Sequence, residues 1–137
     1  MKKTILLASS LLFCAAVLLA EQDTPLEMQM QILARGMKQL SMQINDPAKQ
    51  QENVTLIESL KQAAITSTGL EPRKTASIPQ ADRDKFLADY RAQIGKLSEA
   101  FTQIEDSVKA GKYDQAKSLL TRIGSIKKEG HSKFKQD

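Results

Sequence analysis

The stretch TPLEMQMQILARGMKQLSMQIN, residues 24–45, decides the fold class. Its apolar side chains recur at spacings of four, three, four, three and four residues, which places them on one face of a helix. These positions are Leu26, Met30, Leu33, Met37, Leu40 and Ile44. Thr24, Pro25 and Glu27 are typical of a helix start, because the threonine and glutamate can exchange hydrogen bonds and proline suits the first helical position. The pattern predicts an amphipathic helix that ends at Asn45.

Three further segments show helical periodicity. Asp46 and Pro47 predict another helix start, while Gly69 and Gly111 predict helix ends. The predicted elements are a helix over 46–68, a loop over 69–81, a helix from 81 or 82 to 110, and a helix over 113–135. Their expected inward positions are Val54, Ile57, Leu60 or Lys61, Ala64, Phe86, Tyr90, Ile94, Leu97, Phe101, Ile104, Val108, Ala116, Leu119, Leu120, Ile123 and Ile126.

The four predicted helices are joined by short connections after the first and the third. The sequence shows neither an internal repeat nor a strand pattern. We therefore expect an all-α protein, an antiparallel up-down-up-down four-helix bundle, in a single domain over residues 21–137. Each helix alone would be marginal in water, so burial of the apolar stripes against one another must hold the bundle together.

Residues 1–20, MKKTILLASSLLFCAAVLLA, have the pattern of a secretory signal peptide. Two lysines precede an apolar run, and Ala20 is a suitable residue for cleavage. Leu18 is larger than the residue usually found two positions before the cut, so an uncleaved anchor is the alternative. Cys14, the only cysteine, lies in this segment, and Phe13 before it argues against a lipoprotein. The mature chain is thus expected to have no disulfide and no C-x-x-C-H haem attachment motif.

The charge of the mature chain is nearly balanced. Without Lys2 and Lys3, 18 basic residues face 16 acidic ones. The basic residues are dispersed and aromatic residues make up only 4% of the chain, so we expect no nucleic-acid binding. We also expect a monomer with no stable membrane insertion after signal cleavage.

The only histidine, His131, lies near the end of the fourth predicted helix. In an up-down-up-down bundle, this end lies beside the start of the first helix. Met30 is about 8 Å into the first helix and His131 about 6 Å from the end of the fourth, so the two match in depth. Phe86 and Tyr90, early in the third helix, fall in the same layer. A thioether that faces an imidazole is an axial ligand pair of low-spin haem iron.

Other side chains would complete such a site. Lys127 and Lys135, four residues either side of His131, share its face and would approach the haem propionates. However, Met30 also suits a plain core, and lysines near a helix end are favoured by the helix dipole alone. A histidine near a terminus is usually solvated, so spacing and depth leave both interpretations open. The candidate apolar walls are Leu33, Met37, Tyr90, Ile94 and Ile123.

At these residues the sequence resembles the cytochrome b562 family, secreted four-helix bundles that hold one non-covalent haem b. The segment LEMQMQIL resembles the family's opening helix, which implies that Met30 rather than Met28 is an axial ligand. DYRAQI resembles the start of the third helix and implies that Tyr90 lies against the haem. GKYDQA followed by HSKFK resembles the family's last helix. The interval from Gly111 to His131 matches that of the family without an insertion or deletion. The resemblance covers most of the mature chain.

Some positions depart from the family pattern. Ile94 replaces a haem-facing phenylalanine. Lys127 and Lys135 stand where the familiar member has arginines, so the positive charge is kept but the forked donors of the guanidinium are lost. Gly130 replaces an expected aromatic residue and would loosen the helix before His131 by about 1 kcal/mol. These departures bear on haem affinity more than on the fold.

The resemblance implies a periplasmic electron carrier without enzyme activity, which would pass single electrons to redox partners that the sequence does not identify. The alternative is a haem-free periplasmic bundle that binds envelope proteins, favoured by Ile94 and Gly130. Copper binding by methionines is disfavoured, because residues two apart point to nearly opposite helix faces and residues seven apart lie about 10 Å apart along the axis. The methionines concerned are Met28, Met30, Met37 and Met42.

Overall fold

The computed structural model describes residues 22–136, so the predicted signal peptide lies outside the described residues. The described part of the chain is all-helical and without strands, as predicted. Its long helices are α1 (Pro25–Gln43), α2 (Gln50–Thr68), α3 (Arg83–Lys109) and α4 (Tyr113–Phe134). Its short 3-10 turns are η1 (Pro47–Lys49), η2 (Arg73–Ser77) and η3 (Gln80–Asp82). Within residues 22–136, no helix is long and apolar enough to cross a membrane.

The helix starts follow the local sequence signals. Thr24 Oγ1 accepts from the Glu27 N–H at 3.2 Å, and the Thr24 N–H donates to Glu27 Oε2 at 2.6 Å, so α1 begins with the predicted reciprocal cap. Asp46 Oδ1 accepts from the Ala48 N–H at 2.9 Å. This aspartate therefore caps η1, and α2 begins only after that turn. The predicted loop over 69–81 likewise contains η2 and most of η3.

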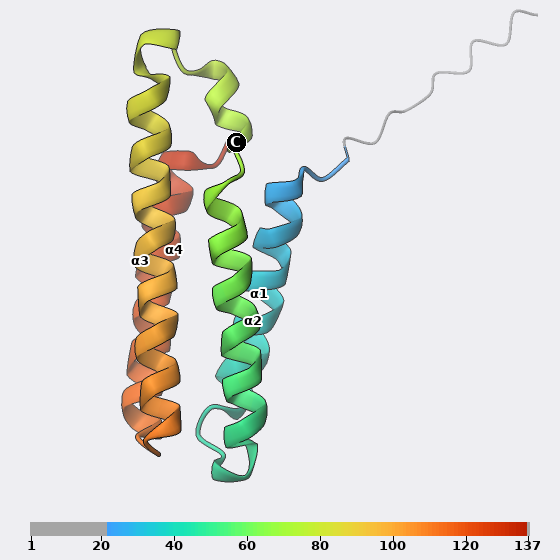
Figure 1. Ribbon diagram of the computed structural model, residues 1–137, viewed down its shortest axis with the longest axis vertical. Helices are drawn as coiled ribbons and strands as arrows, with labels where there is room; N and C mark the ends of the chain where they lie inside the picture. The colour runs from blue at the N-terminus through green and yellow to red at the C-terminus, as the bar shows by residue number, and fades with distance from the viewer. Residues whose placement is uncertain (1–21, 137) are drawn as a thin grey trace, which may run out of the picture.

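Helix α2 packs on α1 and α3, and α3 packs on α4, whereas α1 and α4 meet only sparsely. Figure 1 shows α3 and α4 on one side of the molecule and α1 and α2 on the other. The predicted stripes form the core, with Met30, Met37, Phe86, Leu97, Leu119 and Ile126 only partly buried. The fully enclosed side chains include Leu40, Ile44, Ile57, Leu60, Phe101, Ile104, Val108 and Ile123.

Contacts between helix ends show which ends lie together. The Tyr90 hydroxyl, early in α3, donates to the Ser67 carbonyl near the end of α2 at 2.8 Å. Phe134, the last residue of α4, packs edge-on against Phe86 in α3, with ring centroids 5.3 Å apart. The end of α2, the start of α3 and the end of α4 therefore meet at one end of the molecule.

A tight turn joins α3 and α4 at the opposite end. Gly111 has a φ of +71°, a left-handed conformation that glycine adopts without strain. Its N–H donates to the Val108 carbonyl at 3.0 Å, and the Lys112 N–H donates to the Ser107 carbonyl at 2.8 Å, a common way to end a helix. Gln50, at the start of α2, donates from Nε2 to the Val108 carbonyl at 2.8 Å and ties α2 to this turn.

Candidate functional site

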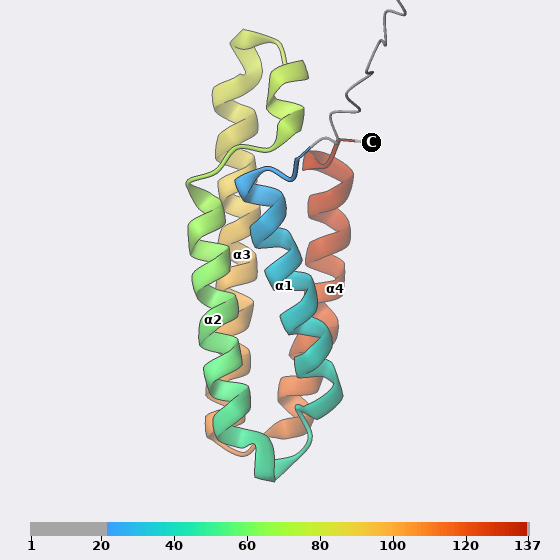
Figure 2. The ribbon, with the colours of Figure 1, turned by 90° about the vertical axis from the view of Figure 1, so that its right-hand side faces the viewer.

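The segment η2 connects the start of α1 with the end of α4. Arg73 donates to the carboxylate of Glu27 in the first turn of α1, with Nε 2.8 Å from Oε1. Its neighbour Lys74 lines a groove together with Phe86 of α3 and Phe134 of α4. Arg73 and Lys74 are neighbours in the chain, and one contacts the start of α1 while the other lies beside the end of α4. The start of α1 and the end of α4 are therefore at the same end of the molecule. Figure 2 shows the blue start of α1 and the red end of α4 at similar heights.

Met30 lies on the flank of α1 that is turned away from α2. Gly36 marks the side that faces α2, because a Cβ there would be 2.5 Å from Leu60 of α2. Met30 and Met37 lie about 100–120° around the helix from Gly36, on the far side of buried Leu33. Both methionines are partly buried against the core.

His131 lies on the flank of α4 that is turned away from α3. Gln93 of α3 donates from Nε2 to the Ile126 carbonyl at 2.9 Å and lies beside Gly130, which marks the side that faces α3. His131 is about 100° around the helix from Gly130 and about 20° from buried Leu120. The imidazole itself is exposed. We call the sparsely packed side between these flanks of α1 and α4 the α1–α4 seam.

The surroundings of His131 favour its neutral form. Lys127 and Lys135 are exposed and lie four residues either side of it, Lys127 on the same face of α4 and Lys135 in the residue that caps the helix. Partial desolvation, followed by the positive charges of these two lysines, holds the pKa of His131 below its ordinary value of 6.5. The imidazole is therefore neutral at pH 7, which is the form that binds metal ions.

The predicted wall residues of α3, Tyr90 and Ile94, are buried. The Tyr90 ring packs edge-on against Phe134, with centroids 5.6 Å apart. Burial raises the pKa of Tyr90 to about 12, and its hydroxyl is held by the Ser67 carbonyl. The candidate site residues proposed from sequence omitted Phe134, although its position eleven residues after Ile123 continues the buried stripe of α4.

A groove adjoins this aromatic cluster on the opposite flank of α4. Lys96 and Lys133, which line it, both approach the Glu129 carboxylate, at 3.8 and 2.9 Å. Their charge is therefore partly neutralised by the same chain. The groove is lined by Lys74, Phe86, Asp89, Ala92, Gln93, Lys96, Ser132, Lys133 and Phe134, none of which was a predicted ligand.

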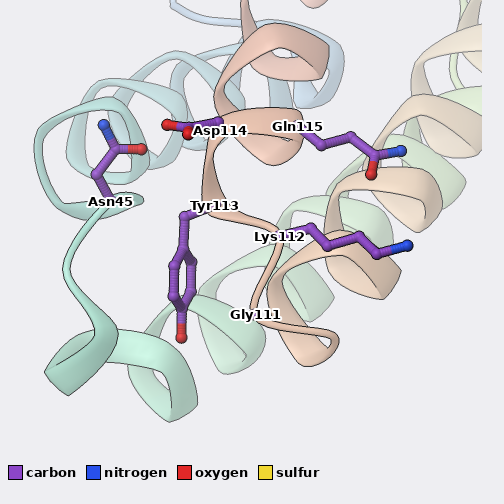
Figure 3. A pocket seen from close by; sticks show the side chains of 6 residues that line it. All are labelled: Asn45, Gly111, Lys112, Tyr113, Asp114 and Gln115. Atoms are coloured by element: carbon purple, nitrogen blue, oxygen red, sulfur yellow. The ribbon is translucent and has the colours of Figure 1, made fainter.

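A second hollow lies at the other end of the molecule, between the α1–α2 and α3–α4 connections. Figure 3 shows the Tyr113 ring between the two connections, while Lys112 and Gln115 point away from it. The other lining residues are Asn45, Gly111 and Asp114. This hollow contains none of the predicted site residues.

Within residues 22–136, no group of three or more His, Cys, Asp or Glu side chains is arranged to hold a metal ion. The α1–α4 seam is flanked instead by the Met30 thioether and the His131 imidazole, the two ligands predicted from the sequence. That pair is known as an axial set for haem iron. Leu33 and Ile94 are buried apolar residues of the same bundle, and Met37 lies on the same flank as Met30.

The described helices form a helical bundle, a class of fold in which cofactor sites are commonly built from side chains on facing helices. The sequence model for cytochrome b562 matches residues 25–135. The chain belongs to the cytochrome b562 family, as the resemblance implied. Membership in this family supports a haem-binding electron-transfer protein. Comparison with curated proteins and with solved structures gave no match.

Proposed function

We propose that the mature chain binds one non-covalent haem b, with Met30 and His131 as axial ligands, and carries single electrons in the periplasm. The observation that supports this most directly is the position of the two side chains. They come from opposite ends of the described sequence, yet both lie on flanks that face the α1–α4 seam near the same end of the molecule. The proposal includes the up-down-up-down order expected from sequence, which the contacts between helix ends support.

The wall and rim residues predicted from the sequence are chemically suited to haem. Leu33, Met37, Tyr90 and Ile94 offer apolar surface for a flat macrocycle, and Lys127 and Lys135 offer cations for its propionates. Bound haem supplies one-electron chemistry at its iron. Because protein side chains would occupy both axial positions, we expect electron exchange without a substrate site, and thus no enzyme activity.

The chain's own residues would prepare this site before haem binds. Partial desolvation of His131 and the charges of its two flanking lysines lower its pKa, which favours the unprotonated imidazole that a metal ion binds. Met30 is already partly buried against the core, so its side chain is held beside the seam before haem binds. Sparse packing between α1 and α4 leaves this side of the bundle as the easiest one to open for a planar guest.

A haem-free bundle that binds other envelope proteins is the second candidate. It is favoured by Ile94, which stands where the family has a haem-facing phenylalanine, and by Gly130 in the turn before His131. In that case the family fold would be kept while the cofactor was lost.

Titration of the mature protein with haemin separates the two candidates. We expect a six-coordinate, low-spin absorbance spectrum at one haem per chain. The variants His131→Ala and Met30→Ala should lose that form. Free-haem absorbance throughout the titration would reject the haem proposal in favour of the second candidate.

Met28→Ala is the matched control for Met30→Ala. Met28 belongs to the same helix, two residues away, but its side chain is half exposed. We therefore expect this variant to keep the bound spectrum. Equal loss in the two methionine variants would contradict the assignment of Met30.

A further inference from the structure

Positive charge is concentrated on the last helix and the two residues that flank it, Lys112 and Lys135. Residues 112–135 carry a net charge of +5, whereas the other residues of 21–137 carry −3. The nearly neutral total of the mature chain therefore conceals a strong asymmetry. A surface of one sign attracts partners of the opposite sign and orients them during encounter.

Two of these lysines lie on one face of α4, and a third, in the residue that caps the end of the helix, continues that face. Lys117, Lys128 and Lys135 are separated by eleven and seven residues, which places them within about 20° of one another around the helix and along about 27 Å of its length. All three are exposed. We call them the α4 lysine face. His131 lies about 40–60° from them, so this face borders the α1–α4 seam.

The α4 lysine face is not neutralised by its own chain. Among the described residues, no carboxylate lies within ion-pair distance of any of its three lysines. Across the seam, the acidic residue of α1 is Glu27, and Arg73 binds its carboxylate. By contrast, Lys61 of α2 and Lys109 of α3 both pair with Glu105.

We propose that the α4 lysine face docks the acidic surface of the protein that exchanges electrons with this chain. The inference rests on the proposed haem function, because it assigns the partner of that same site. Charge complementarity would bring the partner to the flank of α4 that carries His131, the nearest route to a haem held there. Such contacts act mainly through encounter rate and orientation.

Two other anionic occupants fit this surface less well. A membrane surface would need apolar side chains interleaved with the lysines. The residues around this face are instead Thr121, Ser125 and Ser132, and the large exposed apolar side chains belong to α1 and α2. Single-stranded nucleic acid would need exposed aromatic rings for stacking, and none lies on this face.

The test uses poly-L-glutamate as the probe and the mature, isotope-labelled protein before haemin is added. We expect amide chemical shifts to change mainly between residues 117 and 135, with affinity that falls as salt is raised. The double variant Lys117→Glu/Lys128→Glu should bind about tenfold more weakly. The milder Lys117→Gln/Lys128→Gln variant should fall between, and it keeps the test valid if charge reversal disturbs folding.

The matched control is the double variant Lys112→Glu/Arg122→Glu. It makes the same change in net charge close by on the chain, but Lys112 precedes the helix and Arg122 lies at least about 120° around it from the lysine face. We expect the control to lose less than about threefold in affinity. Equal losses in the two double variants, or shifts spread evenly over all helices, would overturn the docking surface.

Two further probes decide the class of partner. Vesicles of phosphatidylglycerol and a duplex DNA are titrated under the same conditions. Binding of either one that is tighter than that of poly-L-glutamate and is abolished by the lysine-face variant would overturn the acidic-protein assignment. All these measurements are made before haemin is added. A failed haemin titration therefore rejects the proposed function without altering the docking result. Chemical-shift changes spread evenly over all helices reject the docking surface even if haem binds.

Discussion

The guanidinium of Arg73 holds the carboxylate of Glu27 through two nitrogens, with Nε 2.8 Å from Oε1 and Nη2 3.0 Å from Oε2. The same Nη2 also donates to the Gln22 carbonyl at 2.7 Å. Glu27 is at the same time part of the cap of α1 with Thr24. One carboxylate therefore both starts the helix that carries Met30 and fastens it to η2.

This arrangement predicts a loss of stability in acid. The hydrogen bond from Arg73, and then that from the Thr24 N–H, lowers the pKa of Glu27 from 4.5 to about 2. Because the folded-state pKa is depressed, the contribution of the carboxylate is full above pH 4.5 and is lost as pH falls towards 2. Glu27→Gln should therefore melt at a lower temperature than the parent at neutral pH, and the gap should close near pH 2. A gap that stays constant over this range in calorimetry would contradict the role of the ionised form.

Tyr90→Phe tests the link between α2 and α3. The variant keeps the ring that packs on Phe134 but removes the donor to the Ser67 carbonyl. We expect urea denaturation to show a loss of about 1–3 kcal/mol, because a buried hydrogen-bonding group loses its partner. Haem binding should survive, since the ring remains, and loss of the bound spectrum in a folded variant would give the hydroxyl a direct role at the site.

Two glycine substitutions should change stability in opposite directions. At Gly36, a Cβ would be 2.5 Å from Leu60 Cδ2, so Gly36→Ala should destabilise the bundle by about 1–3 kcal/mol. At Gly124, a Cβ would meet nothing within 4 Å, so Gly124→Ala should stabilise α4 by up to about 1 kcal/mol. Thermal unfolding of the two variants measures both effects, and a stabilised Gly36 variant would show that α1 and α2 are not closely packed there.

Acid should release the haem through His131. A ligating imidazole must be unprotonated, so protons compete with the iron, and the bound spectrum should disappear well below about pH 6. In the haem-free protein, Lys127→Gln should raise the pKa of His131 towards 6.5, because one of the charges that lowers it is removed. Proton NMR of the single histidine reads this shift directly. An unchanged bound spectrum at about pH 3 would contradict His131 as a ligand.

Local sequence signals predicted most of the fold. Period-3.6 stripes located all four helices, and the Thr24 cap and the Gly111 turn formed as expected because each depends on neighbouring residues only. Asp46 and the 69–81 segment were predicted less well. Both involve 3-10 turns, which span too few residues to show a repeating pattern of apolar side chains.

The parts of the site that depend on tertiary packing were not predictable from the chain alone. Nothing in the sequence indicates that the Tyr90 hydroxyl would reach Ser67, or that Gln93 would bind the backbone of α4. Likewise, periodicity placed Met30 on an inward stripe but could not predict its position on the flank away from α2. That flank follows from the contact of Gly36 with Leu60.

The uneven packing of the four helices also sets how the molecule would open. Helix α1 rests almost wholly on α2, whereas α2, α3 and α4 form a chain of closely packed neighbours. Amide protons in α1 should therefore exchange with solvent sooner than those of α3, through a partial detachment that leaves the other three helices folded. A planar ligand could then enter at the rate of this local opening, and global unfolding of the protein would not be required.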